Sequence, residues 1–280
     1  MNFTIERPSP MPAASSIPPG PASYDPVYFA PLFAIEDHHF WFRARNEVIS
    51  ALVEKELRRL APGYRILEVG CGTGNVLRVL EKICKHGQVI GMDLFLEGLE
   101  YARRRVGLGL VQGDMQAPPF GDKFHLIGLF DVLEHLPDDL QVLDYLYSML
   151  LPGAVLFLTV PAFPSLWSYF DEAGRHVRRY QFHELQTRLE QARFKVETIS
   201  YYMMSIFPLV WMQRKLAPRR SQGKARDEKD VHDRTVNELR IVPVANQALA
   251  TILSLEACWL KSGRRLPFGT SLLAMGRKPD

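Results

Sequence analysis

Short apolar or alternating runs recur along most of the chain, and segments with helical spacing separate them. The runs that predict strands are residues 65–69, 88–93, 109–113, 124–130, 151–163, 194–202 and 270–277. Apolar residues at helical spacing predict helices at residues 44–60, 76–83, 96–102, 138–151 and 182–191. This alternation of strands and helices predicts an α/β fold with a doubly wound, mostly parallel sheet.

Two segments depart from that alternation. Residues 1–26 are rich in Pro, Ala and Ser and predict a disordered arm, which leaves residues 27–280 as a single domain. Residues 203–266 are apolar and basic in turn and predict a helical insert before the last strand. Three functions are open for this insert: a lid, a dimer surface or a membrane-surface element. We do not expect a membrane span, because Pro243, Asn246, Gln247 and Glu256 interrupt the longer apolar run.

Composition narrows the class of protein. The chain has 280 residues, of which 47% are hydrophobic and 11% aromatic, enough for a sizeable core. A net charge of +3 is too small to indicate a nucleic-acid partner. Three cysteines without metal-type spacing indicate a reducing compartment. We therefore expect a cytoplasmic protein, with membrane association through the insert as the alternative.

The first predicted strand ends in a glycine-rich turn, RILEVGCGTGN. Gly70, Gly72 and Gly74 stand at alternating positions after Glu68, with Cys71 between the first two. Such glycines let the backbone turn tightly and approach a ligand, and the next helix supplies free N–H groups. The spacing differs from the dinucleotide pattern G-x-G-x-x-G, which argues against a nicotinamide oxidoreductase. A tight turn without a ligand is the structural alternative.

Acids stand at the ends of the next two strands. Asp93 ends the second strand about 20 residues beyond the turn, where such folds place the acceptor for ribose hydroxyls. Its structural alternative is a helix N-cap. Asp114 follows the third strand, where an acid can accept from an adenine amino group or simply stabilise a turn. Both acids are therefore expected at the edge of the sheet where ligands bind.

The fourth strand ends at Phe130 and continues into DVLEHLPDD. The chain resembles the Rossmann-like (class I) methyltransferases that use S-adenosylmethionine (SAM). The resemblance lies in three features that occur in this order: the E-x-G-x-G-x-G turn after the first strand, the acids Asp93 and Asp114, and this D-V-L-E-H-L stretch. The similarity is to small-molecule methyltransferases of type 11 and the ubiquinone–menaquinone group. It covers about residues 38–200 and returns at the last strand. It implies a seven-stranded sheet with an antiparallel last strand, and SAM as cofactor.

The resemblance also implies which residues bind the cofactor. HFWFRAR is similar to the N-terminal segment of a bacterial subgroup, where Trp41 and Arg45 would lie near the methionine end of SAM or near the substrate, and the guanidinium could pair with a carboxylate. We expect this segment to cover the cofactor pocket. A helix start that packs on the sheet is the alternative. The expected cofactor residues are Trp41, Arg45, Glu68, Gly70, Cys71, Gly72, Gly74, Asp93, Leu94, Asp114, Met115 and Phe130.

Candidate catalytic residues lie in two loops. His135 could be a general base, since a neutral imidazole suits pH 7. Two alternatives are a divalent ion held with Asp131 and Glu134, as in some related enzymes, and a purely structural histidine. His176 and Tyr180 are less favoured candidates for the base and lie in a predicted loop, residues 162–180. This loop resembles the subgroup's G-H-x-R-R-Y stretch, but here the sequence reads GRHVRRY. We expect no resident metal.

These patterns predict a methyltransferase acting on an O acceptor, or an N or C acceptor, of a small and apolar molecule. One alternative is methylation of a lipid, an isoprenoid quinone or a lipid-linked sugar at a membrane surface. Another is a SAM-binding module without turnover. The expected partner is a small-molecule substrate, with a homodimer as an additional alternative.

Overall fold

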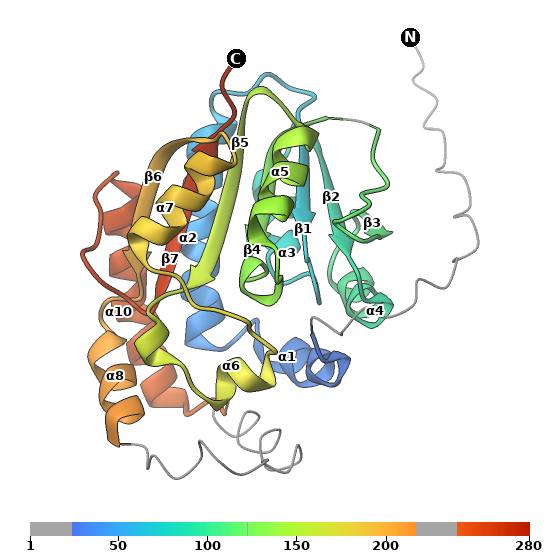
Figure 1. Cartoon of the computed structure of the whole chain (residues 1–280). Coiled ribbons are helices and arrows are strands. Elements are labelled where there is room, and N and C mark those ends of the chain that lie inside the picture. Colours follow the sequence, from blue (N-terminus) through green and yellow to red (C-terminus); the bar gives the residue numbers. More distant parts are fainter. Residues whose placement is uncertain (1–23, 122, 217–239) are drawn as a thin grey trace.

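A seven-stranded sheet forms the centre of the computed structural model, which describes residues 24–121, 123–216 and 240–280 (Figure 1). The strands lie in the order β3-β2-β1-β4-β5-β7-β6, and β7 runs antiparallel to both of its neighbours. Their bounds are β1 Arg65–Val69, β2 Gln88–Asp93, β3 Gly109–Gln112, β4 Phe124–Phe130, β5 Leu150–Pro161, β6 Lys195–Tyr202 and β7 Ser271–Arg277. The predicted fold class is confirmed.

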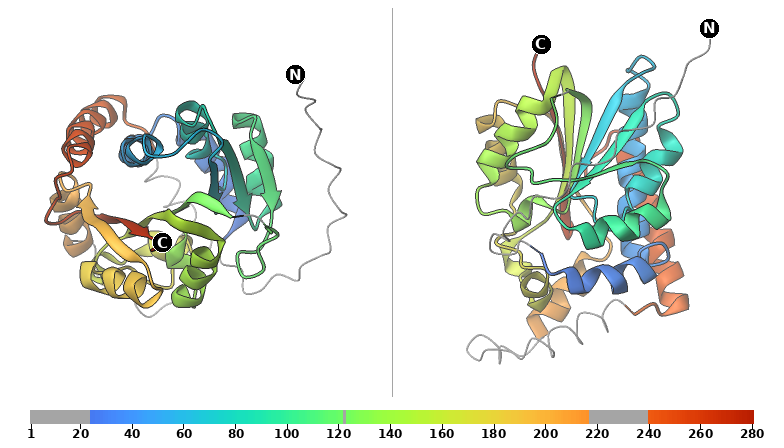
Figure 2. Two further views of the ribbon diagram at one scale, coloured as in Figure 1. Left: turned by 90° about the horizontal axis from the view of Figure 1, so that it is seen from above. Right: turned by 90° about the vertical axis from the view of Figure 1, so that its right-hand side faces the viewer.

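Helices cover both faces of the sheet because its strands are apolar on both sides (Figures 1 and 2). These helices are α2 Phe40–Leu57, α3 Leu77–Ile83, α4 Leu96–Arg105, α5 Asp139–Met149 and α7 Phe182–Gln191. Ile66 packs in one cluster with residues of α2, α3 and α4, whereas its neighbour Leu67 packs in the other with residues of α5 and α7. Adjacent side chains of β1 therefore contribute to two separate cores, one on each face of the sheet.

Short elements gather below the carboxyl ends of the parallel strands (Figures 1 and 2). They are the 3-10 turn Pro26–Tyr28 and the helices α1 Phe29–Ile35, α6 Tyr169–Ala173 and α8 Phe207–Leu216. The prediction of a plain loop over residues 162–180 was wrong, because it contains the 3-10 turn Pro164–Leu166 and helix α6. Asp25 caps the first of these turns, so the end of the predicted arm belongs to the fold. The arm's residues 1–23 lie outside the described residues.

Helix α10, Pro243–Lys261, forms the second part of the insert and packs against α2. The polar residues that interrupt its apolar sequence have internal partners. Asn246 accepts from Phe40 N at 2.8 Å and donates to His38 O at 2.9 Å. Glu256 accepts from the backbone N–H groups of Met204, at 2.9 Å, and Ser205. Among the helices of the described chain, none has the length and hydropathy needed to cross a bilayer.

Candidate active site

A cavity of about 630 Å³ opens at the carboxyl edge of the sheet. Its size is within the range of about 300–1,000 Å³ typical of small-molecule sites. The expected cofactor residues that line it are Trp41, Arg45, Glu68, Gly70, Cys71, Gly72, Asp93, Leu94, Asp114, Met115 and Phe130. His135 and His176 also line it, whereas Gly74 and Tyr180 do not. The structure therefore brings most of the predicted site residues together.

The glycines of the turn have different functions. A Cβ on Gly70 would lie 2.4 Å from a methyl carbon of Val132, and one on Gly74 would lie 3.0 Å from Ala102 of α4. These two positions are small because other parts of the protein pack on them. Gly72 has a φ of +49°, and the nearest atom to its Cβ would be in Phe29, at 3.7 Å. Gly72 therefore faces the cavity, where a ligand can approach the backbone.

Asp93 is buried at the end of β2 and accepts two backbone hydrogen bonds. Its carboxylate accepts from Gly72 N at 2.7 Å and from Phe95 N at 2.9 Å. Burial raises the pKa of Asp93 to about 6, although these hydrogen bonds oppose the shift. Each carboxylate oxygen keeps further acceptor capacity for a ribose hydroxyl. Asp93 is not the N-cap of α4, which is Phe95; its structural role is to bind the backbone of Gly72 and Phe95 at the cavity edge.

Asp114 and Met115 form the next part of the wall. Asp114 Oδ1 accepts from Gln116 N at 2.8 Å, which leaves the second oxygen for an external donor. Met115 is buried beside it, and Phe130 is buried at the end of β4. A carboxylate next to apolar side chains is suited to a planar ring that carries an amino group.

Arg45 is buried and already paired within the protein. Its Nη1 donates to Asp131 at 2.9 Å and its Nη2 to Asn75 at 3.1 Å, while its guanidinium lies 5.2 Å from the Trp41 ring centre. The carboxylate partner expected for Arg45 is therefore Asp131 in this structure. Asp131 has a φ of +54°, a strained conformation that occurs often at functional sites.

Glu68 is the feature that best tests whether the cofactor fits. It is buried in β1, and its Oε2 has no hydrogen-bond partner among the described residues. Burial raises the pKa of Glu68 well above its usual value, although the charge of Arg45 opposes this. A buried oxygen without a partner costs free energy unless a ligand donates to it. The ammonium group of an amino-acid moiety such as that of SAM would do so.

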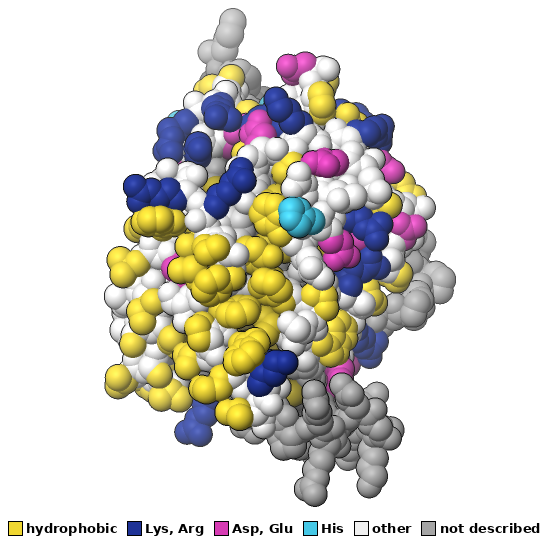
Figure 3. All heavy atoms as spheres, turned by 60° about the vertical axis from the view of Figure 1, so that its left-hand side comes forward, with side chains coloured by type: hydrophobic (Ala, Val, Ile, Leu, Met, Phe, Trp, Pro, Cys, Tyr) yellow, Lys and Arg dark blue, Asp and Glu magenta, His cyan; other side chains and the backbone are white. Residues whose placement is uncertain are grey.

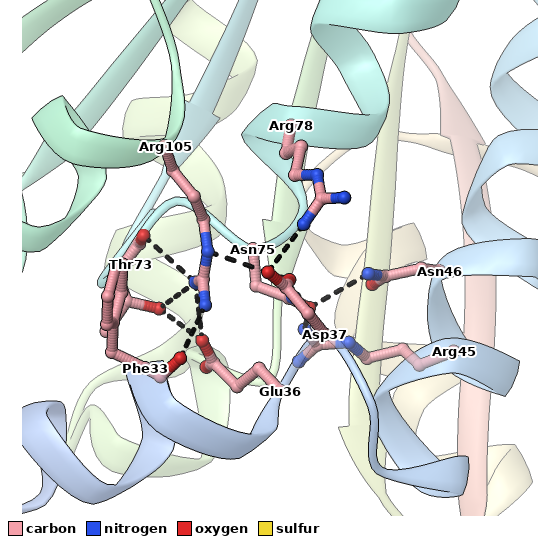
Figure 4. A network of polar contacts seen from close by, with 9 residues as sticks. All are labelled: Phe33, Glu36, Asp37, Arg45, Asn46, Thr73, Asn75, Arg78 and Arg105. Atoms are coloured by element: carbon pink, nitrogen blue, oxygen red, sulfur yellow. Dashed lines mark hydrogen bonds and ion pairs between the residues drawn. The ribbon is translucent and has the colours of Figure 1, made fainter.

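A polar network joins the segment after α1 to the glycine turn (Figure 4). Glu36 accepts from Thr73 and, at 2.7 Å, from Arg105, which also donates to Phe33 O at 2.9 Å. Asp37 accepts from Asn75 at 3.1 Å. These contacts hold residues 24–37, which we call the N-terminal cover, against the glycine turn.

His135 and His176 are in edge-to-face contact in the cavity wall, with ring centres 4.6 Å apart and ring planes at 86°. His176 Nδ1 lies 2.9 Å from Asp171 Oδ1, which also accepts from Arg179 Nε at 2.6 Å. Burial would raise the pKa of Asp171, but the hydrogen bonds and charges of His176 and Arg179 lower it below its ordinary value. An ionised Asp171 therefore orients the His176 ring.

One group in the described chain has the spacing for a cation. Ligand atoms of Glu134, His135 and His176 all lie within 4.8 Å of one another. Asp131, which the sequence offered for the same purpose, instead accepts from Arg45 and from Thr159 at 3.0 Å. The cation-capable group therefore keeps Glu134 and His135 of the set considered in the sequence and has His176 in place of Asp131.

The structure does not bring Tyr180, a second candidate base, to the cavity. Its side chain is completely buried, and its hydroxyl donates to Asp139 at 3.1 Å.

The imperfect match at the glycine of G-H-x-R-R-Y also has a structural counterpart. Arg175 precedes His176 and has a φ of +55°, the left-handed region that glycine adopts at least cost.

Sequence reasoning did not identify Tyr24 or Asp171 as site residues. The Tyr24 ring lies 5.2 Å from Phe29 and 5.6 Å from His135, so it covers part of the cavity. Nothing in the Pro-rich sequence around Tyr24 indicates this contact. The proximity of Asp171 and His176 in sequence was the only indication of their pairing.

Comparison with known proteins agrees with this geometry. The family model described as "Methyltransferase domain" matches residues 41–199. A ubiquinone/menaquinone biosynthesis C-methyltransferase of Legionella pneumophila is 30% identical over 152 residues, 50% of this chain and 57% of that protein. A demethylmenaquinone methyltransferase of Lactiplantibacillus plantarum is 28% identical, over 54% of this chain and 81% of that protein. The match to the Legionella protein thus spans little more than half of its length.

Similar folds occur among solved structures. A Haloferax volcanii protein solved with the Trm112 methyltransferase activator has a TM-score of 0.57 at 16% identity, over 91% of this chain and 97% of that one. A SAM-dependent methyltransferase from Clostridium acetobutylicum has a TM-score of 0.51 at 12% identity, over 84% and 92% of the two chains. At these identities the similarity concerns the fold.

Proposed function

Because the chain belongs to the class I SAM-dependent methyltransferase family, we propose that it transfers the methyl group of SAM to a small acceptor in the cavity. The observation that carries the proposal is one cavity lined both by the Asp93–Gly72 turn and by the Asp171–His176 pair. The Asp93–Gly72 turn is suited to binding an adenosine. The Asp171–His176 pair is suited to an acceptor that loses a proton during the reaction.

The cofactor residues would divide between the two parts of SAM. Asp93 would accept from the ribose hydroxyls and Asp114 from the adenine amino group, while Glu68 would accept from the ammonium group. SAM supplies an already activated methyl group, so transfer is an in-line displacement. The main task of the protein is then to hold the acceptor in line and to exclude water.

His176 is the better candidate for the base. Its hydrogen bond with ionised Asp171 assigns the proton to Nδ1, which leaves Nε2 as the accepting nitrogen. Such a nitrogen can take the proton of a hydroxyl as the oxygen attacks the methyl carbon. This favours an O acceptor over a C or N acceptor. His135 would position the acceptor beside it.

The acceptor is proposed to be apolar. The part of the wall that lies outside the expected cofactor residues includes Leu136, Phe170, Ile206 and Val210. The relatives named above are described as methyltransferases of quinone biosynthesis. A lipid or isoprenoid-like molecule agrees with both observations. Its hydroxyl group is inferred from His176 alone, because the Legionella relative is described as a C-methyltransferase.

Labelled SAM tests the proposal directly. The protein is incubated with SAM carrying a tritiated methyl group and a bacterial lipid extract, and the radioactivity that enters organic solvent is measured. We expect transfer by the wild-type protein and none by Asp93→Ala. SAM binding in calorimetry without any labelled product, in lipid or aqueous extracts, would instead indicate a binding module. Absence of SAM binding would overturn the proposal.

A further inference from the structure

Exposed apolar side chains gather on the insert, on the side of the molecule shown in Figure 3. Helix α8 presents Leu209, Met212 and Leu216 at helical spacing, and α10 presents Ile252, Leu255 and Trp259 in the same way. Together with Trp211 and Phe268 they are 39–74% exposed. We call these eight residues the docking face. Large exposed apolar patches are unusual on soluble proteins and mark sites of interaction.

The two helices of the docking face are held together internally. Glu256 of α10 binds the backbone just before α8, as described above. The Phe207 ring of α8 lies 5.3 Å from that of Phe268, which follows α10. The face is therefore built by paired elements, and its side chains are not exposed by chance at separate places.

The charges on the two segments that carry the docking face are mostly basic, although Lys261 is paired with Glu54 of α2 at 3.6 Å and Arg214 lines the cavity. The described residues 203–216 and 240–268 contain the basic residues Arg214, Lys215, Arg240, Lys261, Arg264 and Arg265. Their single acid, Glu256, is buried. Lys215 lies 5.8 Å from the Trp211 ring centre, and the Arg264 guanidinium lies 4.3 Å from that of Trp259. Tryptophans next to cations are typical of the boundary between lipid and water.

From these observations we propose that the docking face binds the surface of a bilayer that contains anionic lipid. A second copy of the chain is a poorer occupant, since a twofold contact would bring two sets of basic residues together. The tryptophans and aliphatic side chains would enter the headgroup region, and the cations would lie over anionic headgroups.

The docking face also adjoins the cavity. Helix α8 contributes Val210, Gln213 and Arg214 to the cavity wall, while Leu209 and Met212 belong to the docking face. An acceptor dissolved in the bilayer could thus reach the cavity along α8. This last step rests on the proposed function, whereas binding to the membrane does not.

Vesicle flotation of the 280-residue chain tests the proposal. One set of vesicles contains phosphatidylcholine alone and the other contains 30% phosphatidylglycerol, both at 0.1 M NaCl. The variant Arg264→Glu with Arg265→Glu removes two cations next to the face. The matched control, Arg103→Glu with Arg104→Glu, makes the same charge change on two exposed residues of α4. A third variant, Leu209→Ser with Met212→Ser, removes apolar surface.

We expect wild-type protein to float with the phosphatidylglycerol vesicles. The first and third variants should bind at least about tenfold more weakly, and the α4 control should bind like wild type. Circular dichroism melts verify that all variants fold. Failure to float, or an equal loss in both charge variants, would overturn the proposal. So would a stable dimer in light scattering that leaves vesicles unbound. SAM calorimetry, done separately, tests the proposed function alone.

Discussion

Two buried acids of the cavity, Asp93 and Asp171, have pKa values displaced in opposite directions. Burial dominates at Asp93 and raises its pKa, whereas His176 and Arg179 outweigh burial at Asp171 and lower its pKa. One carboxyl is therefore poised to change its proton occupancy near pH 6, and the other stays ionised. Opposite shifts of this kind assign different tasks to chemically identical groups.

The raised pKa of Asp93 predicts a pH dependence of SAM binding. Ionised Asp93 accepts from ribose hydroxyls, and protonation removes part of that capacity. SAM affinity should be full above about pH 7 and fall as the pH drops through the pKa of about 6. The same shift also affects stability. Because the folded protein holds this proton more tightly than the unfolded chain, the contribution of Asp93 to the free energy of unfolding falls as the pH rises from 3.8 to about 6.

Calorimetry from pH 5 to pH 8 checks this prediction. Asp93→Asn should bind SAM about 10- to 100-fold more weakly at pH 8, and most of its pH dependence should disappear. An unchanged pH profile in Asp93→Asn would assign the dependence to another group.

The Asp171–His176 pair makes a prediction for turnover. His176→Gln should lower kcat by about 10²- to 10⁴-fold and leave SAM affinity nearly unchanged. Tyr180→Phe is the matched control in the same loop, because Tyr180 bonds to Asp139 outside the cavity. It should cost about 1 kcal/mol in the free energy of unfolding and retain kcat. Loss of kcat in Tyr180→Phe alone would restore Tyr180 as the base.

At the scale of elements, the strands were the most predictable part. Runs of apolar residues interrupted by glycine and proline identified all seven, and the ends of β1, β2 and β4 identified the site edge. Helix α2 begins at Phe40, before its apolar pattern, because the His39 side chain accepts from Trp41 N. Asn246 and Glu256 look in sequence like interruptions of an apolar run. Their backbone partners are distant in sequence, so no local pattern could reveal them.

The network of Figure 4 predicts how the N-terminal cover is held. Arg105→Met should leave Glu36 as an uncompensated buried carboxylate and lower the free energy of unfolding by about 3–5 kcal/mol. Arg78→Met is the matched control, since the Arg78 side chain is 41% exposed where it pairs with Asp37. Its effect should stay within about 1 kcal/mol. Urea unfolding measures both, and equal effects would show that the network is not a buried unit.

At the scale of the whole molecule, the cavity is assembled from widely separated parts of the chain. Tyr24, Arg45, Asp93, His176 and Val210 all line it. Sequence motifs predicted the part made by the sheet edge, because strand ends have recognisable patterns. For residues 24–37 and α8 the sequence offered a cover or a lid only among alternatives, because tertiary packing decides which of their side chains reach the cavity.

A ligand bound across so many segments should stabilise the entire fold. At a SAM concentration about 100-fold above Kd, the free energy of unfolding should rise by about 2.7 kcal/mol. This corresponds to a rise in Tm of about 5–10 °C for a chain of this size. Differential scanning fluorimetry measures the rise, which Asp93→Ala should abolish. A ligand-independent Tm at saturating SAM would contradict the assignment of this cavity.

Helix α8 takes part in both the cavity wall and the docking face, and this double role has a kinetic consequence. Any shift of α8 when its outer side chains enter lipid would reshape the acceptor end of the cavity. The enzyme would then show interfacial activation: empty anionic vesicles would accelerate methylation of a water-soluble, short-chain acceptor. Helix α8 would thus contribute both to where the protein resides and to how fast it turns over.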